Sequence, residues 1–455
     1  MKETPLGLFF DARGARKKGG AAIMQRQRER LAEMVAYART CSPYYRRHYQ
    51  GLPARITDPG LLPVTTKAAL MAQFDDWVTD PAVTLEETQS FVEDPSLVGA
   101  KFLGRYTVAT TSGTTGTRGV FLLDTRSLAV AKALTFRMLS TWFTPADLIG
   151  IIRGSGRVAM VIATGGHFAS AAAAAALRKG PGRQRVGVFP VQTPMPDLIA
   201  QLNSFRPAIL APYASTGRLL AFEQEAGRLN IQPTAVILAA EGLPEGEYHR
   251  ISAAFGAKVS QGYAATECPL LSYSCKESWL HVNSDWAILE PVDANHKPVP
   301  PGQPSHTVLL SNLANRIQPI LRYDLGDSVT MRTDPCPCGD PTPALHVQGR
   351  TAELLTFPGS AGLPVSVTPL TLSTALDKVR GLSKGQIVQT APQGLTLRLQ
   401  PAPGADPARV FEAARSEIAA VLAGHGLDNV TLTRDPGPPR LTSGGKHRTV
   451  IPLPP

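Results

Sequence analysis

A loop rich in glycine and hydroxyl residues is the segment of this sequence best suited to bind an anion. Residues 106–119 read YTVATTSGTTGTRG, so a strand-like stretch runs directly into the small residues of 110–116. Glycines let backbone N–H groups curl toward an anion, and threonine and serine hydroxyls add further donors. The Gly-Lys-Ser/Thr ending of a Walker loop is missing. The segment therefore predicts a phosphate-binding loop that is not a Walker loop. For a Ser/Thr/Gly cluster taken by itself, a flexible turn is the alternative.

Four possible metal ligands form a second constellation. Cys275 and His281 make a Cys-x5-His pair, and Cys336 and Cys338 make a Cys-x-Cys pair. Three thiols and an imidazole suit a closed, tetrahedral, structural Zn²⁺ site. The Cys-x-Cys spacing is shorter than the usual Cys-x2-Cys knuckle, so a set of reduced cysteines beside a helix-terminal histidine stays open as the alternative. Cys268 is a spare candidate ligand.

Through the middle of the chain, short apolar runs alternate with segments of helical periodicity. Such alternation predicts an α/β fold with a mostly parallel sheet. After residue 280 the pattern favours strands, and from 350 a smaller α/β unit follows. The runs that predict buried strands are 158–163, 185–191, 208–211, 235–240 and 258–261, and the segments that predict helices include 23–49, 169–179, 196–205, 215–228, 247–255 and 407–423.

Length and charge limit the class of protein. A chain of 455 residues is too long for one ordinary domain. No apolar run reaches the roughly 18 residues of a membrane-spanning helix, so no membrane partner is expected. The net charge is +10, and residues 1–50 carry +7 of it. The simplest interpretation is a solvated basic face on an N-terminal helix, and no nucleic-acid partner is expected.

The cysteine content indicates the compartment. Five cysteines are an odd and sparse set for this length, and they favour a reducing cytoplasm over a disulfide scaffold. The N-terminal apolar stretch is too short and too charged for a secretory signal. A cytoplasmic location is therefore expected.

The order TTSGTTG followed by a basic residue resembles the phosphate loop of the adenylate-forming enzymes, which include acyl- and aryl-CoA ligases and adenylation domains. Four further segments are similar to motifs of that superfamily and occur in the same order, which makes the resemblance specific over about three-quarters of the chain. These segments are QGYAATE at 261–267, YDLGD at 323–327, the pair GR at 349–350 and TSGGKHR at 442–448.

A closer resemblance is to the phenylacetate-CoA ligase branch of the superfamily. It rests on SPYYR at 42–46, LPVTTK at 62–67, LHVN at 280–283 and CPCG at 336–339. The resemblance implies a large adenylation body of several subdomains over 1–349, a hinge at 350–353 and a small mobile α/β lid over 354–455.

The reaction implied by the resemblance joins an aryl or related carboxylic acid to ATP with Mg²⁺. Pyrophosphate leaves, and the acyl group of the acyl-adenylate then passes to CoA. A carrier-protein thiol or an amine or other nitrogen nucleophile stays open as the acceptor. A degenerate relative that only binds nucleotide is the non-enzyme alternative, and a homodimer is left open.

The resemblance also assigns residues to the chemical step. Thr266 would donate to the α-phosphate, and Glu267 would hold Mg²⁺, a hard cation suited to carboxylate oxygens. Lys446 would place a positive charge between the carboxylate and the α-phosphate, where negative charge develops. The β- and γ-phosphates would be held by Thr111, Ser112, Gly113, Thr114, Thr115 and Gly116.

The nucleoside would be bound by a second group of residues. Tyr263 would stack on adenine beside Gly262 and Glu241, and Asp327 and Arg350 would contact the ribose. Taken alone, each of these residues has a plainer role as a turn, a cap or a solvated side chain.

The acid pocket is expected around Gly165, His167, Tyr213, Ala239 and Gly262. His167 would gate the pocket or steer the carboxylate and is counted among the catalytic candidates. A packed, hydrogen-bonded histidine is an equal alternative.

The sequence departs from the family pattern at two places, after the phosphate loop and at the hinge. The phosphate loop is followed by Arg118, where the family often has Pro-Lys. The hinge has Ala352 and Glu353 after Gly-Arg, so the usual side-chain contacts of the pivot are in doubt.

Overall fold

The computed structural model divides the chain into two compact units. The first unit comprises Met1–Ala240, Ile251–Leu325 and Val329–His346, and the second comprises Glu241–Arg250, Gly326–Ser328 and Val347–Pro455. The predicted hinge residues 351–353 lie outside the described part of the chain. The structure describes residues 4–111, 119–164, 166–179, 182–191, 193–240, 242–243, 245–350, 355–359, 364–367, 369–441 and 448–453.

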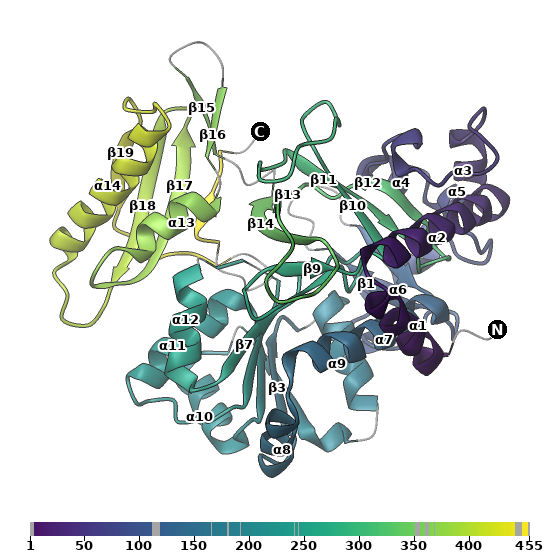
Figure 1. Cartoon of the computed structure of the whole chain (residues 1–455). Coiled ribbons are helices and arrows are strands. Elements are labelled where there is room, and N and C mark those ends of the chain that lie inside the picture. The colour runs from purple at the N-terminus through teal and green to yellow at the C-terminus, as the bar shows by residue number, and fades with distance from the viewer. Residues whose placement is uncertain are drawn as a thin grey trace. The chain divides into compact units, whose positions relative to one another are not determined.

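A five-stranded, entirely parallel sheet lies in the first unit (Figure 1). Its order is β4-β3-β5-β6-β7. Every predicted strand and intervening helix of this region is present, which confirms the α/β prediction. The strands are β3 (Val158–Ile162), β4 (Val186–Pro190), β5 (Ile209–Pro212), β6 (Ala235–Leu238) and β7 (Lys258–Gln261), and the helices are α9 (Ala169–Lys179), α10 (Met195–Phe205), α11 (Ala214–Glu225) and α12 (Glu245–Phe255).

The strand order reverses between β3 and β5. The chain first moves outward from β3 to β4 and then returns past β3 to form β5, β6 and β7 in sequence. Open α/β sheets bind ligands at such a switch point, outside the carboxyl ends of the strands. The carboxyl ends of β3 and β5 therefore mark the expected ligand edge of this sheet.

In the other sheets of the first unit, β1–β2, β10–β11, β11–β12, β14–β9 and β9–β8 pair in antiparallel fashion. One hairpin frames the glycine-rich loop, and β14 continues from the first unit into the second. The sheets are β1 (Thr107–Thr110) with β2 (Val120–Leu123), β10 (Ala287–Val292) with β11 (Thr307–Asn312) and β12 (Ile320–Asp324), and β13 (Asp327–Met331), β14 (Ala344–Arg350), β9 (Leu280–Val282) and β8 (Ser272–Ser274) in that order.

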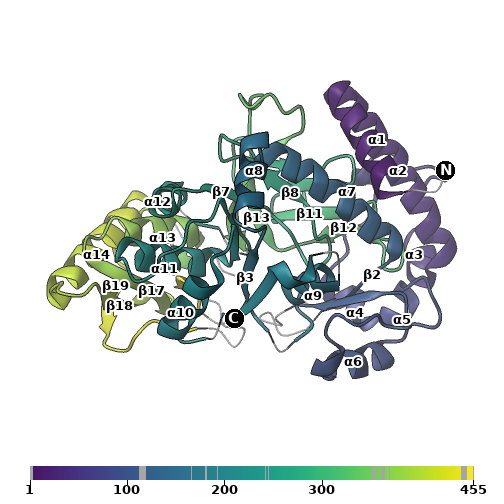
Figure 2. The same ribbon diagram turned by 90° about the horizontal axis from the view of Figure 1, so that it is seen from below.

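Helices dominate the first 153 residues. The predicted helix 23–49 is two helices broken at Ser42, because its hydroxyl accepts the Tyr45 N–H and Pro43 follows at the first position of the next helix. Helix α1 packs along α7, as Figures 1 and 2 show. The helices are α1 (Pro5–Lys17), α2 (Gly20–Cys41), α3 (Pro43–His48), α4 (Lys67–Ala72), α5 (Phe74–Trp77), α6 (Leu85–Glu93), α7 (Thr125–Trp142) and α8 (Pro145–Arg153), with 3-10 turns at Pro59–Leu61, Pro95–Leu97 and Arg183–Arg185.

Part of the N-terminal positive charge is used inside the fold. Arg26 and Arg30 both pair with Asp11, at 2.6 and 2.9 Å. The Arg30 guanidinium also lies 3.5 Å from the centroid of the Trp286 ring. These two side chains are therefore half-buried and paired with an acid, in addition to facing solvent in part. None of the described helices combines the length and apolar character needed to cross a bilayer.

The second unit has its own core of aliphatic side chains. A four-stranded sheet in the order β19-β18-β17-β20 carries helices α13 and α14, and a separate hairpin precedes it. The elements are β15 (Leu355–Pro358), β16 (Pro364–Val367), α13 (Pro369–Asp377), β17 (Leu382–Ala391), β18 (Gly394–Pro401), α14 (Pro407–Gly424), β19 (Thr431–Asp435) and β20 (Val450–Ile451).

A buried ion pair joins α7 to the segment before β10 and generates a stability prediction. Arg137 donates to Asn283 and Asp285 at 2.7 and 2.9 Å, and both charged side chains are buried. Burial alone would lower the pKa of Arg137, but the Asp285 carboxylate outweighs it and raises the pKa. We expect Arg137→Met to lower the free energy of unfolding by about 3–5 kcal/mol, because the buried Asp285 carboxylate loses its nearer arginine and keeps only Arg30, at 3.8 Å.

Urea unfolding followed by tryptophan fluorescence measures this change, since Trp77, Trp142, Trp279 and Trp286 all belong to the first unit. The exposed Arg153→Met variant is the control and should stay within about 0.5 kcal/mol of the parent. Equal stability of the two variants would show that the Arg137 pair contributes nothing.

Candidate functional site

The base of the glycine-rich loop is closed by Thr111. Its backbone N–H donates to the Gly119 carbonyl at 3.0 Å, and its hydroxyl oxygen accepts the Gly119 N–H at 2.9 Å. Strands β1 and β2 bring the two ends together, with Thr110 opposite Val120. The predicted phosphate ligands at 112–116, and Arg118, lie outside the described residues. The described residues thus form a closed stem at the base of the loop.

The loop stem is attached to the segment that follows β3. The Thr110 N–H donates to the carbonyl of His167 at 2.7 Å, and Thr110 bridges to Phe168 in parallel fashion. The His167 side chain is buried, with Nε2 3.2 Å from the Asp94 carbonyl and the ring 5.3 Å from that of Phe91. These contacts agree with a packed, hydrogen-bonded histidine, and a role in steering the substrate stays a prediction.

Tyr213 links the carboxyl ends of β3 and β5 at the switch point. Its hydroxyl accepts the backbone N–H of Ala163 at 3.1 Å and lies 3.0 Å from Ser170 Oγ. Tyr213 also bridges to Ala239 at the end of β6. The structure therefore brings together these two predicted pocket residues, whereas Gly165 and Glu241 lie outside the described residues.

The segment after β7 is held by hydroxyls of β8. Ser272 Oγ accepts the Tyr263 N–H at 3.3 Å, and the Ser272 N–H donates to the Tyr263 carbonyl at 3.0 Å. A Cβ atom added at Gly262 would lie 3.2 Å from the Ser272 carbonyl oxygen, so the close approach favours glycine there. Tyr263 itself is half-buried against the core of the first unit.

Thr266 and Glu267 occupy the centre of a tight two-residue turn. Ala265 and Cys268 exchange backbone hydrogen bonds of 3.1 and 3.0 Å on either side of it. The pair is therefore not a helix N-cap, which was the plainer alternative for a Thr-Glu sequence. The turn places the two side chains next to each other. This agrees with the expectation that Thr266 contacts a phosphate while Glu267 contacts a metal ion bound to it.

The Glu267 carboxylate is buried and hydrogen-bonded. Its Oε1 accepts from the Tyr323 hydroxyl at 2.9 Å, and its backbone carbonyl accepts from Asn312 Nδ2 at 2.9 Å. Burial raises the pKa of neighbouring Cys268 to about 12, and the Glu267 charge adds to this effect. A fixed carboxylate of this kind suits Mg²⁺, which takes one or two protein carboxylates beside phosphate oxygens.

The remaining predicted nucleotide ligands fall in the second unit or at its border. Asp327 is buried at the start of β13, directly after Gly326, whose φ of +73° gives the tight turn from β12. Arg350 ends β14. Lys446 lies outside the described residues.

Two residues that lie near the site, Tyr323 and Lys67, were not predicted from the sequence to belong to it. Tyr323, on β12, supplies the hydrogen bond to Glu267 and is the first residue of the YDLGD motif, which was the available signal. Lys67, in the LPVTTK segment, has its Cδ 3.3 Å from the position that a Cβ of Gly119 would take. Its chain thus passes the end of the glycine-rich loop, and no spacing in the sequence indicates that approach.

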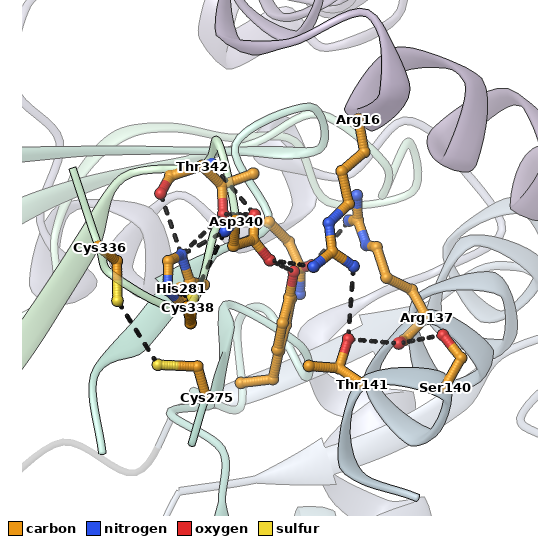
Figure 3. A network of polar contacts seen from close by, with 12 residues as sticks. Arg16, Arg137, Ser140, Thr141, Cys275, His281, Cys336, Cys338, Asp340 and Thr342 are labelled. Atoms are coloured by element: carbon orange, nitrogen blue, oxygen red, sulfur yellow. Dashed lines mark hydrogen bonds and ion pairs between the residues drawn. The ribbon is translucent and has the colours of Figure 1, made fainter. Parts of the chain in front are cut away.

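The predicted metal ligands Cys275, His281, Cys336 and Cys338 form one group, here called the Cys3His cluster (Figure 3). Their ligand atoms all lie within 4.8 Å of one another. The Cys275 and Cys336 Sγ atoms are 3.7 Å apart, and Cys338 Sγ is 3.2 Å from His281 Nε2. Two ligands come from β8–β9 and two from the loop before β14, so the chain segments converge as expected from the sequence.

A tight turn and partial burial shape the Cys-x-Cys part of the cluster. Gly339, at φ +85°, closes the CPCG turn by donating its N–H to the Cys336 carbonyl at 3.0 Å. Burial raises the pKa of the Cys338 thiol to about 12 and lowers the pKa of His281. Both shifts favour the neutral forms of the Cys338 thiol and the His281 imidazole.

Comparison with known proteins gives structural likeness only. No protein-family model matches the chain, and no curated protein matches it in sequence. It is similar to 2-hydroxyisobutyryl-CoA ligase in the postadenylation state with 2-HIB-AMP, at 22% identity over 95% of this chain and 89% of that chain, with a TM-score of 0.69. The same ligase in the thioesterification state with 2-HIB-AMP and CoA gives 23% identity over the same shares and a TM-score of 0.55. The amide bond synthetase McbA from Marinactinospora thermotolerans gives 15% identity over 75% of this chain and 67% of that chain, with a TM-score of 0.50.

These neighbours define the fold class. The chain has the α/β fold of the adenylate-forming acyl-CoA ligases, including a C-terminal domain. The particular branch, phenylacetate-CoA ligase-like, stays a prediction.

The Tyr213 contact generates a prediction about the ligand edge of the sheet. Tyr213→Phe keeps the ring but leaves the buried Ala163 N–H without its acceptor. We expect the free energy of unfolding to fall by about 1–3 kcal/mol, the usual cost of an unsatisfied buried donor.

Tyr49→Phe is a matched control, because the buried Tyr49 hydroxyl makes no hydrogen bond among the described residues. That variant should be neutral or slightly stabilised. Urea unfolding of both proteins measures the difference, and a Tyr213 variant as stable as the control would contradict the proposed bridge.

Proposed function

We propose that this protein is an AMP-forming ligase that activates an aryl or related organic acid with ATP and transfers the acyl group to CoA. The observation that carries the proposal is the buried Glu267 carboxylate on a tight turn, held by Tyr323. Support also comes from the position of Tyr213 at the switch point of the parallel sheet and from the likeness of the whole fold to a CoA ligase that binds an acyl-adenylate.

The first step requires a carboxylate to attack the α-phosphate of ATP, and both groups are anionic. The glycine-rich loop would bind the β- and γ-phosphates through residues 111–116, and the Thr266 hydroxyl would donate to the α-phosphate. Lys446 would neutralise the charge that develops between the acid and the α-phosphate. Pyrophosphate then leaves as the acyl–phosphate bond forms.

Glu267 is the proposed protein ligand of Mg²⁺. The Tyr323 hydroxyl donates to Oε1 of this buried carboxylate and fixes its position on the turn. When bound, Mg²⁺ would reduce the negative charge of the phosphates that the nucleophile approaches. Tyr263, Asp327 and Arg350 are the proposed contacts of the adenosine.

Rotation of the second unit about 350–353 would follow adenylation and admit the thiol. CoA is the proposed acceptor, because the likeness that spans 95% of the chain is to a CoA ligase. The likeness to an amide synthetase spans 75%, so an amine acceptor is the weaker candidate.

Carboxylate-dependent ATP–pyrophosphate exchange tests the proposal with a panel of aryl and alkyl acids. We expect exchange with at least one acid, and a thioester by mass spectrometry once CoA is added. AMP binding without exchange for any acid would indicate a nucleotide-binding relative. Exchange without thioester would show that the acceptor is a different nucleophile.

Lys446→Ala is expected to reduce exchange by about a thousandfold, the scale for loss of one group that stabilises transition-state charge. Lys378→Ala is the control, since that lysine is 63% exposed on the second unit. It should exchange at the parent rate. Full activity of the Lys446 variant would refute the assignment of this lysine.

Glu267→Gln tests the magnesium ligand. The amide keeps an oxygen to accept from Tyr323 but loses the charge, so we expect the Mg²⁺ concentration for half-maximal exchange to rise about tenfold or more. The exposed Glu29→Gln should leave it unchanged. An unchanged Mg²⁺ dependence in the Glu267 variant would place the metal elsewhere.

A further inference from the structure

We propose that the Cys3His cluster binds one structural Zn²⁺ ion that fastens helix α1 to the β8–β9 and β14 region of the first unit. The site is separate from the Glu267 turn and does not depend on the proposed ligase activity. Its parts are three thiols, one imidazole and a buried polar network behind them (Figure 3).

The distances between ligand atoms agree with tetrahedral zinc. Zn–S bonds of about 2.3 Å and Zn–N bonds of about 2.0 Å place neighbouring ligand atoms about 3.5–3.8 Å apart. The Cys275 and Cys336 sulfurs are 3.7 Å apart, and Cys338 Sγ and His281 Nε2 are 3.2 Å apart. These two pairs are within a few tenths of an ångström of tetrahedral spacing, and all four ligand atoms lie within 4.8 Å of one another.

His281 is oriented as a zinc ligand should be. Its Nδ1 lies 3.0 Å from the Thr342 carbonyl, to which it can only donate. The proton therefore sits on Nδ1, and the Nε2 lone pair faces the cysteines. A ring N–H held by a backbone carbonyl is the usual outer contact of a metal-binding histidine.

Asp340 connects the cluster to α1. Its backbone N–H donates to Cys338 Sγ at 3.4 Å, and its side chain, 1% exposed, pairs with Arg16 of α1 at 2.8 Å. The Tyr273 hydroxyl donates to the same carboxylate oxygen at 2.7 Å. Arg16 in turn donates to Thr141 of α7 at 3.4 Å. The Asp340 carboxylate thus links the ligand loop directly to α1, and Arg16 extends the link to α7.

The four protein ligands fill a tetrahedral coordination sphere, so the ion would have a structural and not a catalytic role. The competing arrangement is a Cys275–Cys336 disulfide. The two sulfurs stand 3.7 Å apart as free thiols, well beyond the roughly 2.05 Å of an S–S bond. A disulfide would also leave Cys338 and the oriented His281 without a function.

Elemental analysis of the full chain, purified without chelators and exposed to zinc, tests the site. We expect about one zinc per chain in the parent and in Cys41→Ser, a cysteine outside the cluster, and about a tenth or less in Cys336→Ser. Since the Cys336 variant can fail to fold, the parent is also loaded with Co²⁺, which should give the absorption of a tetrahedral thiolate site.

Hydrogen exchange tests the link to α1. Removal of zinc from the parent should speed amide exchange in α1 but not in α10, and Arg16→Gln should do the same while it retains zinc. A parent chain that takes up neither zinc nor Co²⁺, or that carries a Cys275–Cys336 disulfide, would overturn the metal site. Unchanged α1 exchange after zinc removal would overturn its fastening role.

Discussion

The hydrogen bond from the Thr110 N–H to the His167 carbonyl is the contact on which the arrangement of the site depends. It joins the β1–β2 hairpin, which frames the glycine-rich loop, to the chain that leaves the carboxyl end of β3. Packing of the His167 ring on Phe91 and its contact with the Asp94 carbonyl fix the acceptor side of this bond. The described stem of the loop is therefore attached to the carboxyl edge of the parallel sheet.

Buried polar groups, and not excess charge, organise the first unit around this contact. The carboxylates of Asp285 and Asp340 each receive an arginine from the helical N-terminal region, and Glu267 receives a tyrosine hydroxyl. Buried charges need such partners because desolvation otherwise costs several kcal/mol. Arginines of the helical N-terminal region thus pair with acids that lie more than a hundred residues further along the chain.

Local patterns in the sequence were sufficient for the strands and helices of the parallel sheet, whereas the signal for the Cys3His cluster was the ligand type of its residues. Strand β3 and helix α9 appear at the predicted positions because apolar runs and helical periodicity are properties of neighbouring residues. The bond between Tyr323 and Glu267 spans 56 positions, and no periodicity encodes such a pair. The pairing of Arg16 with Asp340 is a similar case. The packing of His167 is a further case. Its ring contacts Phe91 and the Asp94 carbonyl, and no sequence motif links His167 to these two residues.

Strand β8 connects the two constellations of the first unit. Its Ser272 and Ser274 hydroxyls accept the Tyr263 and Gln261 amides, and Cys275 follows directly at its end. The same three-residue strand thus carries the hydroxyls that fix the chain after β7 and, at its end, a ligand of the Cys3His cluster. A displacement of Cys275 is therefore one residue away from the hydrogen bond that holds Gln261.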